Sequence, residues 1–410
     1  MREPFSFDWF DIDVDLGVSF PGAYTKTDFD NHGTSGGGYD KVNNFLYANL
    51  GAQVQLGYFG ATLSGEFLRY IVNSASSSAN LTLTSGRYHA LLAYGLANDQ
   101  FVIGAGLRAA SLQLSQSNSL VPTNSPSILT MTGAAPEVGL LVKPNDMPVR
   151  IGATVRAPVN GSTFGTSSAT VDAQGTTRAG SLALPTEITL PWELEVGFAV
   201  QVGPRPLNPS WIDPHEQESR VRNAIADERA RRERRNEEIV IAAAPEQRAV
   251  LRAELDREEE AVRKVEDERM RSEAYQLLQE RKARYANWPR ERILVLASLL
   301  VTGASDSAVS LEGFLDQTRE PFGQRITLSP RVGIEAEPIV NLVRSRVGSY
   351  LEPSRFETGT LRQHFTFGGD VRLLPFDAFG LTKGQVWRFS VALDVAPRYV
   401  DWGIAFGAWH

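Results

Sequence analysis

Charged residues stand at every second position in several stretches of the sequence, and this spacing can gather like groups on one face. Near the start, Asp11, Asp13 and Asp15 alternate with large apolar residues, so an extended chain would align their three carboxylates. The carboxylates could form a functional cation site or acidic patch, or they could only be part of a solvated wall, and we favour the solvated wall. An EF-hand calcium loop also requires a glycine turn and a bidentate glutamate at fixed positions, which this stretch lacks.

Other charged side chains share the same alternating placement, opposite rows of apolar residues. These further candidates are Arg150, Arg156, Glu193, Glu195, Arg331, Glu335, Arg344, Arg346, Asp370, Arg372, Arg388 and Asp394. Opposite charges that face one another across an enclosed space could hold a plug or orient a carboxylate, and they could equally satisfy one another.

The residue types needed for catalysis show no matching pattern. The five histidines, His32, His89, His215, His364 and His410, have no short metal or triad spacing. The chain has no cysteine, and no glycine-rich phosphate loop stands between a strand and a helix. We therefore expect no catalytic residue, no metal site, no cofactor and no enzyme activity.

The last fifty residues show which elements position the charged candidates. Apolar and polar or small residues alternate strictly over 365–373, 387–395 and 400–408, which predicts strands with one apolar face. About ten residues is the length that a tilted strand needs to cross a bilayer. Charged and small residues suit the inside of a water-lined barrel, and aromatics at strand ends suit its interfacial girdles. The pattern predicts an all-β transmembrane barrel whose lumen the charged candidates line.

Eleven further segments read as strands, which gives about fourteen antiparallel strands. Their approximate ranges are 10–20, 49–58, 61–70, 87–96, 101–114, 129–143, 149–155, 192–202, 293–301, 325–337 and 343–351. The alternation slips in the third segment, and a one-residue bulge near Gly65 would restore it. The stretch 160–183 reads as a loop, and 308–315 could add a short strand. In the first half of the chain short turns alternate with long loops, and with an even number of strands this predicts that both termini lie in the periplasm, although the outer link 396–399 is shorter than the inner link 374–386.

The stretch 204–290 separates the barrel portions 1–203 and 291–410. It has no glycine up to residue 289 and is rich in Ala, Glu, Arg and Gln, which favour helices. We expect a charged helical hairpin on the periplasmic side, with helices at about 214–238 and 245–285. Residues 214–285 could dock a periplasmic partner protein, or form only a solvated hairpin, which we slightly favour.

Composition excludes some classes of partner and location. The net charge of −7 argues against a nucleic-acid partner. No apolar run reaches the roughly 18 residues of a membrane helix. The start of the chain lacks the features of a signal peptide, so for an outer-membrane protein we expect the natural signal to have been removed or to lie upstream.

Several short stretches resemble strand pairs of the FadL family of outer-membrane transporters for hydrophobic compounds. These stretches are 135–141 (APEVGLL), 148–153 (PVRIGA), 156–159 (RAPV) and 184–191 (LPTEITLP). The resemblance covers the barrel portions, about three quarters of the chain. The family's Asn-Pro-Ala hatch motif is missing, and the large helical insertion is not a usual family element. The family's inward kink in its third strand would fall at Gly65.

The resemblance implies a function for the barrel. It implies passive transport of hydrophobic, fatty-acid-like small molecules across the bacterial outer membrane, with membrane lipid around the barrel. The alternative is an outer-membrane anchor or assembly protein that does not transport and docks a periplasmic partner through its helical insertion.

Overall fold

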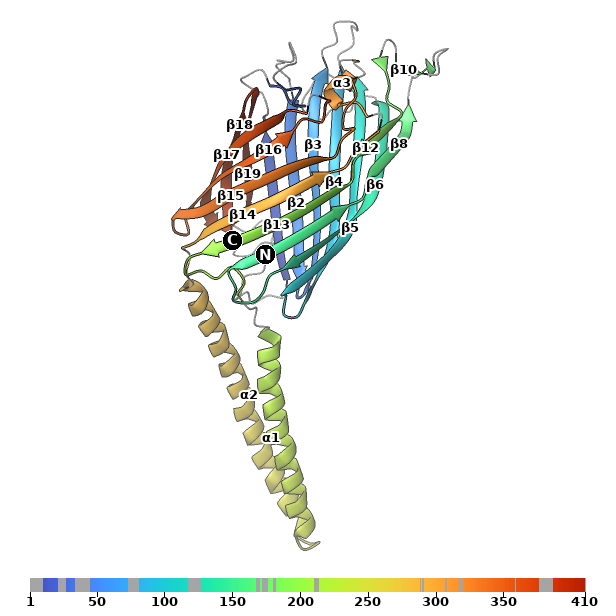
Figure 1. Cartoon of the computed structure of the whole chain (residues 1–410). Coiled ribbons are helices and arrows are strands. Elements are labelled where there is room, and N and C mark those ends of the chain that lie inside the picture. The colour runs from blue at the N-terminus through green and yellow to red at the C-terminus, as the bar shows by residue number, and fades with distance from the viewer. Residues whose placement is uncertain are drawn as a thin grey trace. The chain divides into compact units, whose positions relative to one another are not determined.

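The structure, a computed structural model, describes most of the chain. The described residues are 10–20, 27–33, 45–72, 81–116, 127–166, 170–171, 176–179, 182–209, 214–287, 289, 291–306, 308–315, 317, 320–357, 359–375 and 386–409. They form two compact units, a β-barrel within Trp9–Pro209 and Arg290–His410 and a helical unit within Ser210–Pro289 (Figure 1).

The barrel wall consists of fourteen strands joined in one closed antiparallel ring. These strands are β1 Phe10–Ser19, β2 Phe45–Leu56, β3 Phe59–Val72, β4 Leu81–Leu96, β5 Phe101–Gln116, β6 Ser127–Val142, β7 Val149–Arg156, β13 Glu193–Val202, β14 Ile293–Thr302, β15 Thr327–Ile339, β16 Val343–Pro353, β17 Leu361–Pro375, β18 Val386–Ala396 and β19 Tyr399–Ala408. The ring closes because β1 pairs with β19, and β7 pairs with both β6 and β13. All fourteen correspond to predicted segments, so the predicted barrel is confirmed.

The two ends of the barrel differ in their connections. At one end, which we call the mouth, β1, β3 and β5 finish and longer links follow. At the other end, which we call the base, short turns join β2 to β3 and β4 to β5. Strand β13 also finishes at the base and β14 begins there, so the helical unit is inserted into the chain at this end.

The alternation of the strands separates an apolar outer face from a polar lumen. On β5, Ile103 and Leu107 are exposed whereas Arg108 is buried, and on β6 Val138 and Leu140 are exposed whereas Glu137 is buried. A closed ring turns exposed apolar side chains outward, so such a surface needs an apolar solvent around it. Exposed aromatics mark the base, where Phe59 pairs with Tyr94, as expected of an interfacial girdle.

Two strands lie outside the ring, one in the stretch 160–183 that was predicted as a loop and one directly after that stretch. Strand β8 (Val159–Thr166) pairs with the mouth half of β6 and with β12 (Glu187–Leu190), which forms an edge of the described sheet. A Cβ on Gly133 of β6 would lie 2.6 Å from the Cα of Gly161, so β8 crosses β6 in close backbone contact. Only glycine fits at this crossing.

The β8–β12 hairpin packs on protein on its inner side, which explains why its sequence was misread. Val159, Ile188 and Leu190 pack with Ala110 of β5 and Ala135 of β6, which lie on the lumenal face. The inner side of the hairpin therefore packs on the lumen wall. Strand β8 (VNGSTFGT) has few apolar residues, so its sequence lacks the alternation of the wall strands. Three further short strands, β9 Thr170–Val171, β10 Thr177–Ala179 and β11 Leu182–Ala183, form a separate small sheet within the same predicted loop.

The bulge predicted near Gly65 is wrong. The ladders of β3 with β2 and β4 run past Gly65 without a register shift. In this regular register Leu68 points into the lumen, where it packs against an apolar cluster. The alternation slips in the sequence because the lumen itself becomes apolar at this height.

The optional strand at 308–315 is also wrong, because Leu311–Leu315 forms a short helix, α3. Leu311 and Phe314 of α3 pack against the same apolar cluster that Leu68 contacts. A five-residue segment with apolar residues three apart is read equally well as one helical turn or a short strand.

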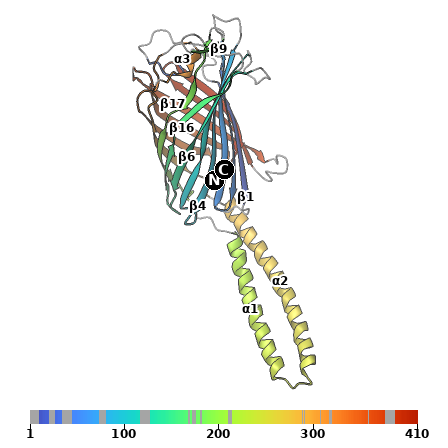
Figure 2. The same ribbon diagram turned by 90° about the vertical axis from the view of Figure 1, so that its right-hand side faces the viewer.

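The helical unit is the predicted charged hairpin, with α1 at Pro214–Ala242 and α2 at Arg248–Ala286. The two helices run side by side (Figure 2), and ion pairs such as Arg229–Glu266 at 3.0 Å join them. Helix α1 extends through Ile239–Ala242, which the sequence had assigned to the link between the helices. None of the described helices combines the length and the apolarity that a membrane span requires.

Candidate functional site

A cavity of about 450 Å³ opens on the lumenal wall of the barrel, along strands β6, β7, β13, β14 and β15. Its lining is mostly apolar, with Leu141, Leu294 and Leu296 among the residues that form it. This volume lies within the range of small-molecule binding sites. We call this cavity the groove.

The floor of the groove follows from the register of the sheet. Leu141, Gly152, Gly197, Ser298 and Arg331 are successive cross-strand partners and so form one row across five strands. The three residues in the middle of the row are small. Around Gly197, a Cβ would meet only the Ala297 carbonyl and the Ser298 Cβ, both at 3.8 Å. The groove therefore exists because small residues align where other rows carry bulky ones.

Two arginines border the groove in different ways. Arg150 is held in place, since its Nε donates to Asn208 Oδ1 at 2.6 Å and its Nη2 to the Leu207 carbonyl at 2.5 Å. Arg331 is 44% exposed, and its ion pair with Glu195 is long at 3.7 Å. Arg331 is thus the more accessible of the two cations to a ligand in the groove.

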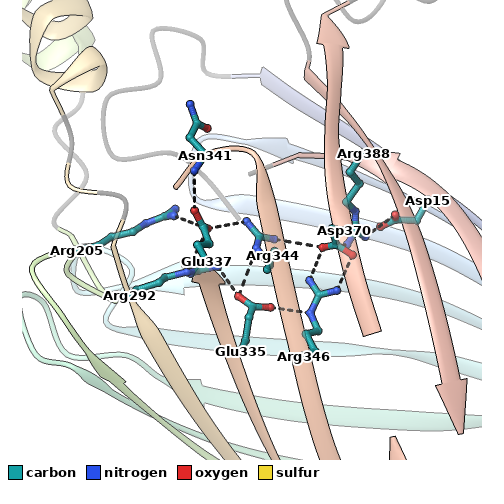
Figure 3. Close-up of polar contacts among 10 residues, drawn as sticks. All are labelled: Asp15, Arg205, Arg292, Glu335, Glu337, Asn341, Arg344, Arg346, Asp370 and Arg388. Carbon is teal, nitrogen blue, oxygen red and sulfur yellow. Dashed lines mark hydrogen bonds and ion pairs between the residues drawn. The ribbon is translucent and has the colours of Figure 1, made fainter. Parts of the chain in front are cut away.

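A network of buried and partly buried charges crosses the lumenal face towards the base (Figure 3). Its core pairs are Arg346–Asp370 at 2.7 Å, Arg346–Glu335 at 2.7 Å and Arg344–Glu337 at 3.2 Å. Asp370 is completely buried and also lies 3.3 Å from Arg388. Buried charges of this kind are tolerated only when they are paired, which fixes the relative positions of β15, β16, β17 and β18.

The network is extended by residues that sequence reasoning missed. Arg292, directly before β14, lies 2.5 Å from Glu335, and Arg205, after β13, lies 3.6 Å from Glu337. Both arginines stand outside the strands, so no alternation identified them. The strand residue Glu337 was missed although it shares the face of Glu335 two residues earlier, a signal that could have found it.

A second set of charges lies where β7 ends before β8 and where β12 ends before β13. Arg108 of β5 donates from Nε to the Ala157 carbonyl at 2.9 Å, from Nη1 to Glu193 at 3.1 Å and from Nη2 to the Pro191 carbonyl. The strand breaks at Ala157 and Pro191 leave carbonyls without a ladder partner, and the Arg108 guanidinium supplies their donors. Arg108 was not predicted, although it follows the alternation of β5.

The predicted pair Arg156 and Glu193 belongs to this second set. Arg156 contacts Glu193 and Glu195 at 3.4 Å each, and the buried Glu137 at 3.5 Å. His89 also bonds to Glu137, at 2.9 Å from Nδ1. The structure therefore brings Arg156, Glu193 and Glu195 together, and adds Glu137, which shares a face with Gly139 and Leu141.

Asp13 and Asp15 of the first strand have different partners. Asp13 accepts a hydrogen bond from Gln53 at 2.7 Å, whereas Asp15 pairs with Arg388. The side chain of Asp11 lies outside the described residues. In the described part of the chain, no three His, Cys, Asp or Glu side chains gather as metal ligands.

The remaining two candidates lie at opposite ends of the lumen. Arg372 is near the base, where its Nη1 donates to the Asn341 carbonyl at 3.4 Å. Asp394 is near the mouth, where it accepts from Tyr350 at 2.6 Å and lies 2.9 Å from His364 Nδ1. The alternation therefore located one face but could not group its members.

Comparisons with known proteins add solved structures of low similarity. No protein-family model matches the chain, and no curated protein sequence matches it. The structure is similar to the toluene transporter TodX of P. putida, with 11% identity, a TM-score of 0.46, and coverage of 99% of this chain and 91% of that chain. It is also similar to the CymD monoaromatic hydrocarbon channel, with 11% identity, a TM-score of 0.43 and coverage of 97% and 87%.

A further similar structure is a Pseudomonas aeruginosa FadL homologue, with 11% identity, a TM-score of 0.43, and coverage of 97% of this chain and 89% of that chain. These are structures of the same family that the sequence resembles.

Proposed function

We propose that this chain is an outer-membrane channel for the passive passage of hydrophobic small molecules. The observation that carries the proposal is the apolar groove of about 450 Å³ on the lumenal wall. A lumen that served only ions or sugars would not need an apolar groove, because water and charged walls suffice for them. The exposed apolar outer face supports a bilayer as the surroundings, with lipid in contact with residues such as Ile103 and Leu140.

We place the base of the barrel in the periplasm. The support is the distribution of links in the first half of the chain, where short turns join β2 to β3 and β4 to β5 at the base and longer links follow β1, β3 and β5 at the mouth, as in bacterial barrels. The chain ends of β1 and β19 also lie at the base. A fatty-acid-like substrate fits the groove, because Arg331 could pair with a carboxylate while the apolar lining holds the hydrocarbon part.

The test is binding of a fluorescent long-chain fatty acid to the refolded protein in detergent micelles. Replacing Gly197 by leucine fills the middle of the groove, so we expect at least roughly tenfold weaker binding. The control is Gly51→Leu, a lumen-facing glycine of β2 with nothing within 4 Å of a new Cβ. Equal binding by both variants would overturn the groove as the binding site.

The charge of the substrate is tested separately. Arg331→Gln should weaken binding of the fatty acid and leave binding of a neutral hydrocarbon of equal size unchanged. Uptake of labelled substrate by a deletion strain tests transport itself, and uptake equal to that of the parent strain for every hydrophobic substrate would count against it.

A docking role for the helical hairpin is the second candidate function. The observation in its favour is a group of exposed apolar residues near the turn of the hairpin, with Ile241 and Val250 both more than 60% exposed. Deleting 214–285 should then abolish binding of a periplasmic partner while the barrel still folds. If the deleted protein keeps every partner and phenotype, this role is excluded.

A further inference from the structure

A short segment after β1, residues 27–33, is folded by its own contacts. The Asp28 carboxylate accepts the His32 backbone N–H at 2.9 Å and lies 2.9 Å from His32 Nδ1. Asn31 and Gly33 adopt left-handed backbone conformations with φ of 57° and 82°, which bend the segment sharply. The result is a compact turn and not an extended link.

The segment is fixed to one side of the mouth by hydrogen bonds with β16, β17 and the β18–β19 turn. Arg362 Nη1 donates to the Asp28 carbonyl at 2.6 Å, and Arg398 Nη1 donates to the Gly33 carbonyl at 2.7 Å. Asn31 Nδ2 donates to the Glu352 carbonyl at 3.1 Å. These contacts fix the segment, which lies near the start of the chain, to residues from the second half of the sequence.

The other side of the segment reaches an apolar cluster. Phe29 packs against this cluster, which is carried mainly by β4, β5 and β6 and comprises Leu81, Leu83, Leu112, Leu114, Ile128, Leu129, Met131 and Leu184. In the ring, β5 and β17 are seven strands apart in either direction and therefore face one another across the lumen. The segment thus links opposite sides of the mouth.

We propose that residues 27–33 form a strap that closes the lumen at the mouth. When the lumen opens, the strap loses its contacts with β16, β17 and the β18–β19 turn. The proposal rests on the proposed function, in which solutes pass from the mouth towards the groove. Thr27, Asp28 and Asn31 are almost completely buried, so the strap is packed closely against its surroundings. In this proposal, a solute reaches the groove from this side after the strap has moved.

Arg362 is the residue that holds the strap in the closed position. Its Nη1 holds the Asp28 carbonyl of the strap, while its Nε and Nη2 lie 2.7 and 2.6 Å from Glu352 of the wall. One guanidinium therefore joins strap and wall through charge-assisted bonds, which are stronger than neutral ones. Replacing Arg362 by glutamine removes both links at once.

The first test is the conductance of the refolded full-length protein in planar bilayers, which needs no hydrophobic ligand. Arg362→Gln should raise the fraction of time in conducting states roughly tenfold, the effect of losing one charge-assisted hydrogen bond. Arg325→Gln is the matched control, because this exposed arginine near the mouth contacts the Glu357 carbonyl and not the strap. Equal conductance of the two variants would overturn the proposal.

The second test locks the strap. A Cβ at Gly33 lies 3.3 Å from the Thr360 Cβ, close to the separation in disulfides, and the chain has no cysteine of its own. In the double variant Gly33→Cys and Thr360→Cys, oxidation should abolish conducting states and reduction should restore them. An oxidised protein that conducts like the reduced one contradicts a closing strap. Fatty-acid binding in micelles is measured separately, so a barrel that gates without binding would refute only the proposed substrate.

Discussion

The Arg388 guanidinium reaches over strand β19 and donates to the Asp15 carboxylate at 2.7 Å, which joins residues 373 positions apart. Both residues pair with Gly407 in the β19 ladders, and a side chain on Gly407 would occupy the position of the Asp15 carboxylate. Because Gly407 has no side chain, the network of charges near the base extends across the pairing of β19 with β1. This pairing is where the ring of strands closes.

Replacing Gly407 by alanine should break this contact. The new methyl group would displace the Asp15 carboxylate, and overpacking of this kind costs about 1–3 kcal/mol of unfolding free energy. Urea unfolding of the refolded barrel, followed by tryptophan fluorescence, measures the effect. Gly51→Ala is the control, because a Cβ there meets nothing within 4 Å. Equal midpoints for the two variants would show that the Asp15–Arg388 pair is dispensable.

Asp370 is the carboxylate on which the base network depends most. It is completely buried, with Arg346 at 2.7 Å, Arg388 at 3.3 Å and Arg344 at 3.8 Å. Asp370→Asn leaves three arginines with too little negative charge, and breaking a buried pair costs about 3–5 kcal/mol. The same unfolding assay should show this loss, whereas Glu187→Gln, on the exposed part of β12, should leave the midpoint unchanged.

The fourteen wall strands were predictable because lipid imposes an alternating pattern on each of them. Where protein or a filled lumen replaces lipid or water, the pattern fails. Strand β8 was read as a loop because its neighbours on the inner side are protein side chains, and Leu68 suggested a bulge because the lumen there is apolar. The groove was not predicted, since it depends on which small residues become cross-strand partners.

The ion pairs could not be predicted for a related reason. Alternation tells which charges share the lumenal face, but their partners depend on register and on contacts between distant segments. Arg108 and Pro191 are 83 positions apart, and Arg150 and Asn208 are 58 apart. Asn208 lies in a stretch that the sequence grouped with the helical insertion, whereas it belongs to the compact barrel unit.

Arg108 should be essential for the position of the β8–β12 hairpin. Arg108→Leu leaves the Ala157 and Pro191 carbonyls without their donor, and each buried polar group left unpaired costs about 1–3 kcal/mol. We expect faster amide exchange in 157–166 and 187–192, measured by mass spectrometry on the refolded protein. Arg108→Lys keeps a charge near Glu193 without the planar fork, so its exchange should be intermediate. Unchanged exchange in both variants would show that the close contact between Gly133 and Gly161, and not Arg108, positions the hairpin.

The helical hairpin should loosen in acid, because ion pairs join its helices. The hydrogen bond from Arg232 lowers the pKa of Glu259 below its ordinary value of 4.5, although burial opposes this effect. A carboxylate with a lowered pKa in the folded state contributes stability that is complete above pH 4.5 and is lost as the pH falls through the folded-state pKa.

Spin labels at Glu238→Cys on α1 and Glu254→Cys on α2, both exposed, report the separation of the helices in the full-length protein. We expect a narrow distance distribution at pH 7 that broadens below pH 4.5. Adding Glu259→Gln should reproduce the broadening at pH 7, because the neutral amide cannot replace the charge that faces Arg232. Adding Glu260→Gln, which removes a pair with Lys264 on the same helix, should not. If the distribution stays narrow with Glu259→Gln, the few buried apolar residues, Ile225 and Val240 among them, hold the hairpin instead.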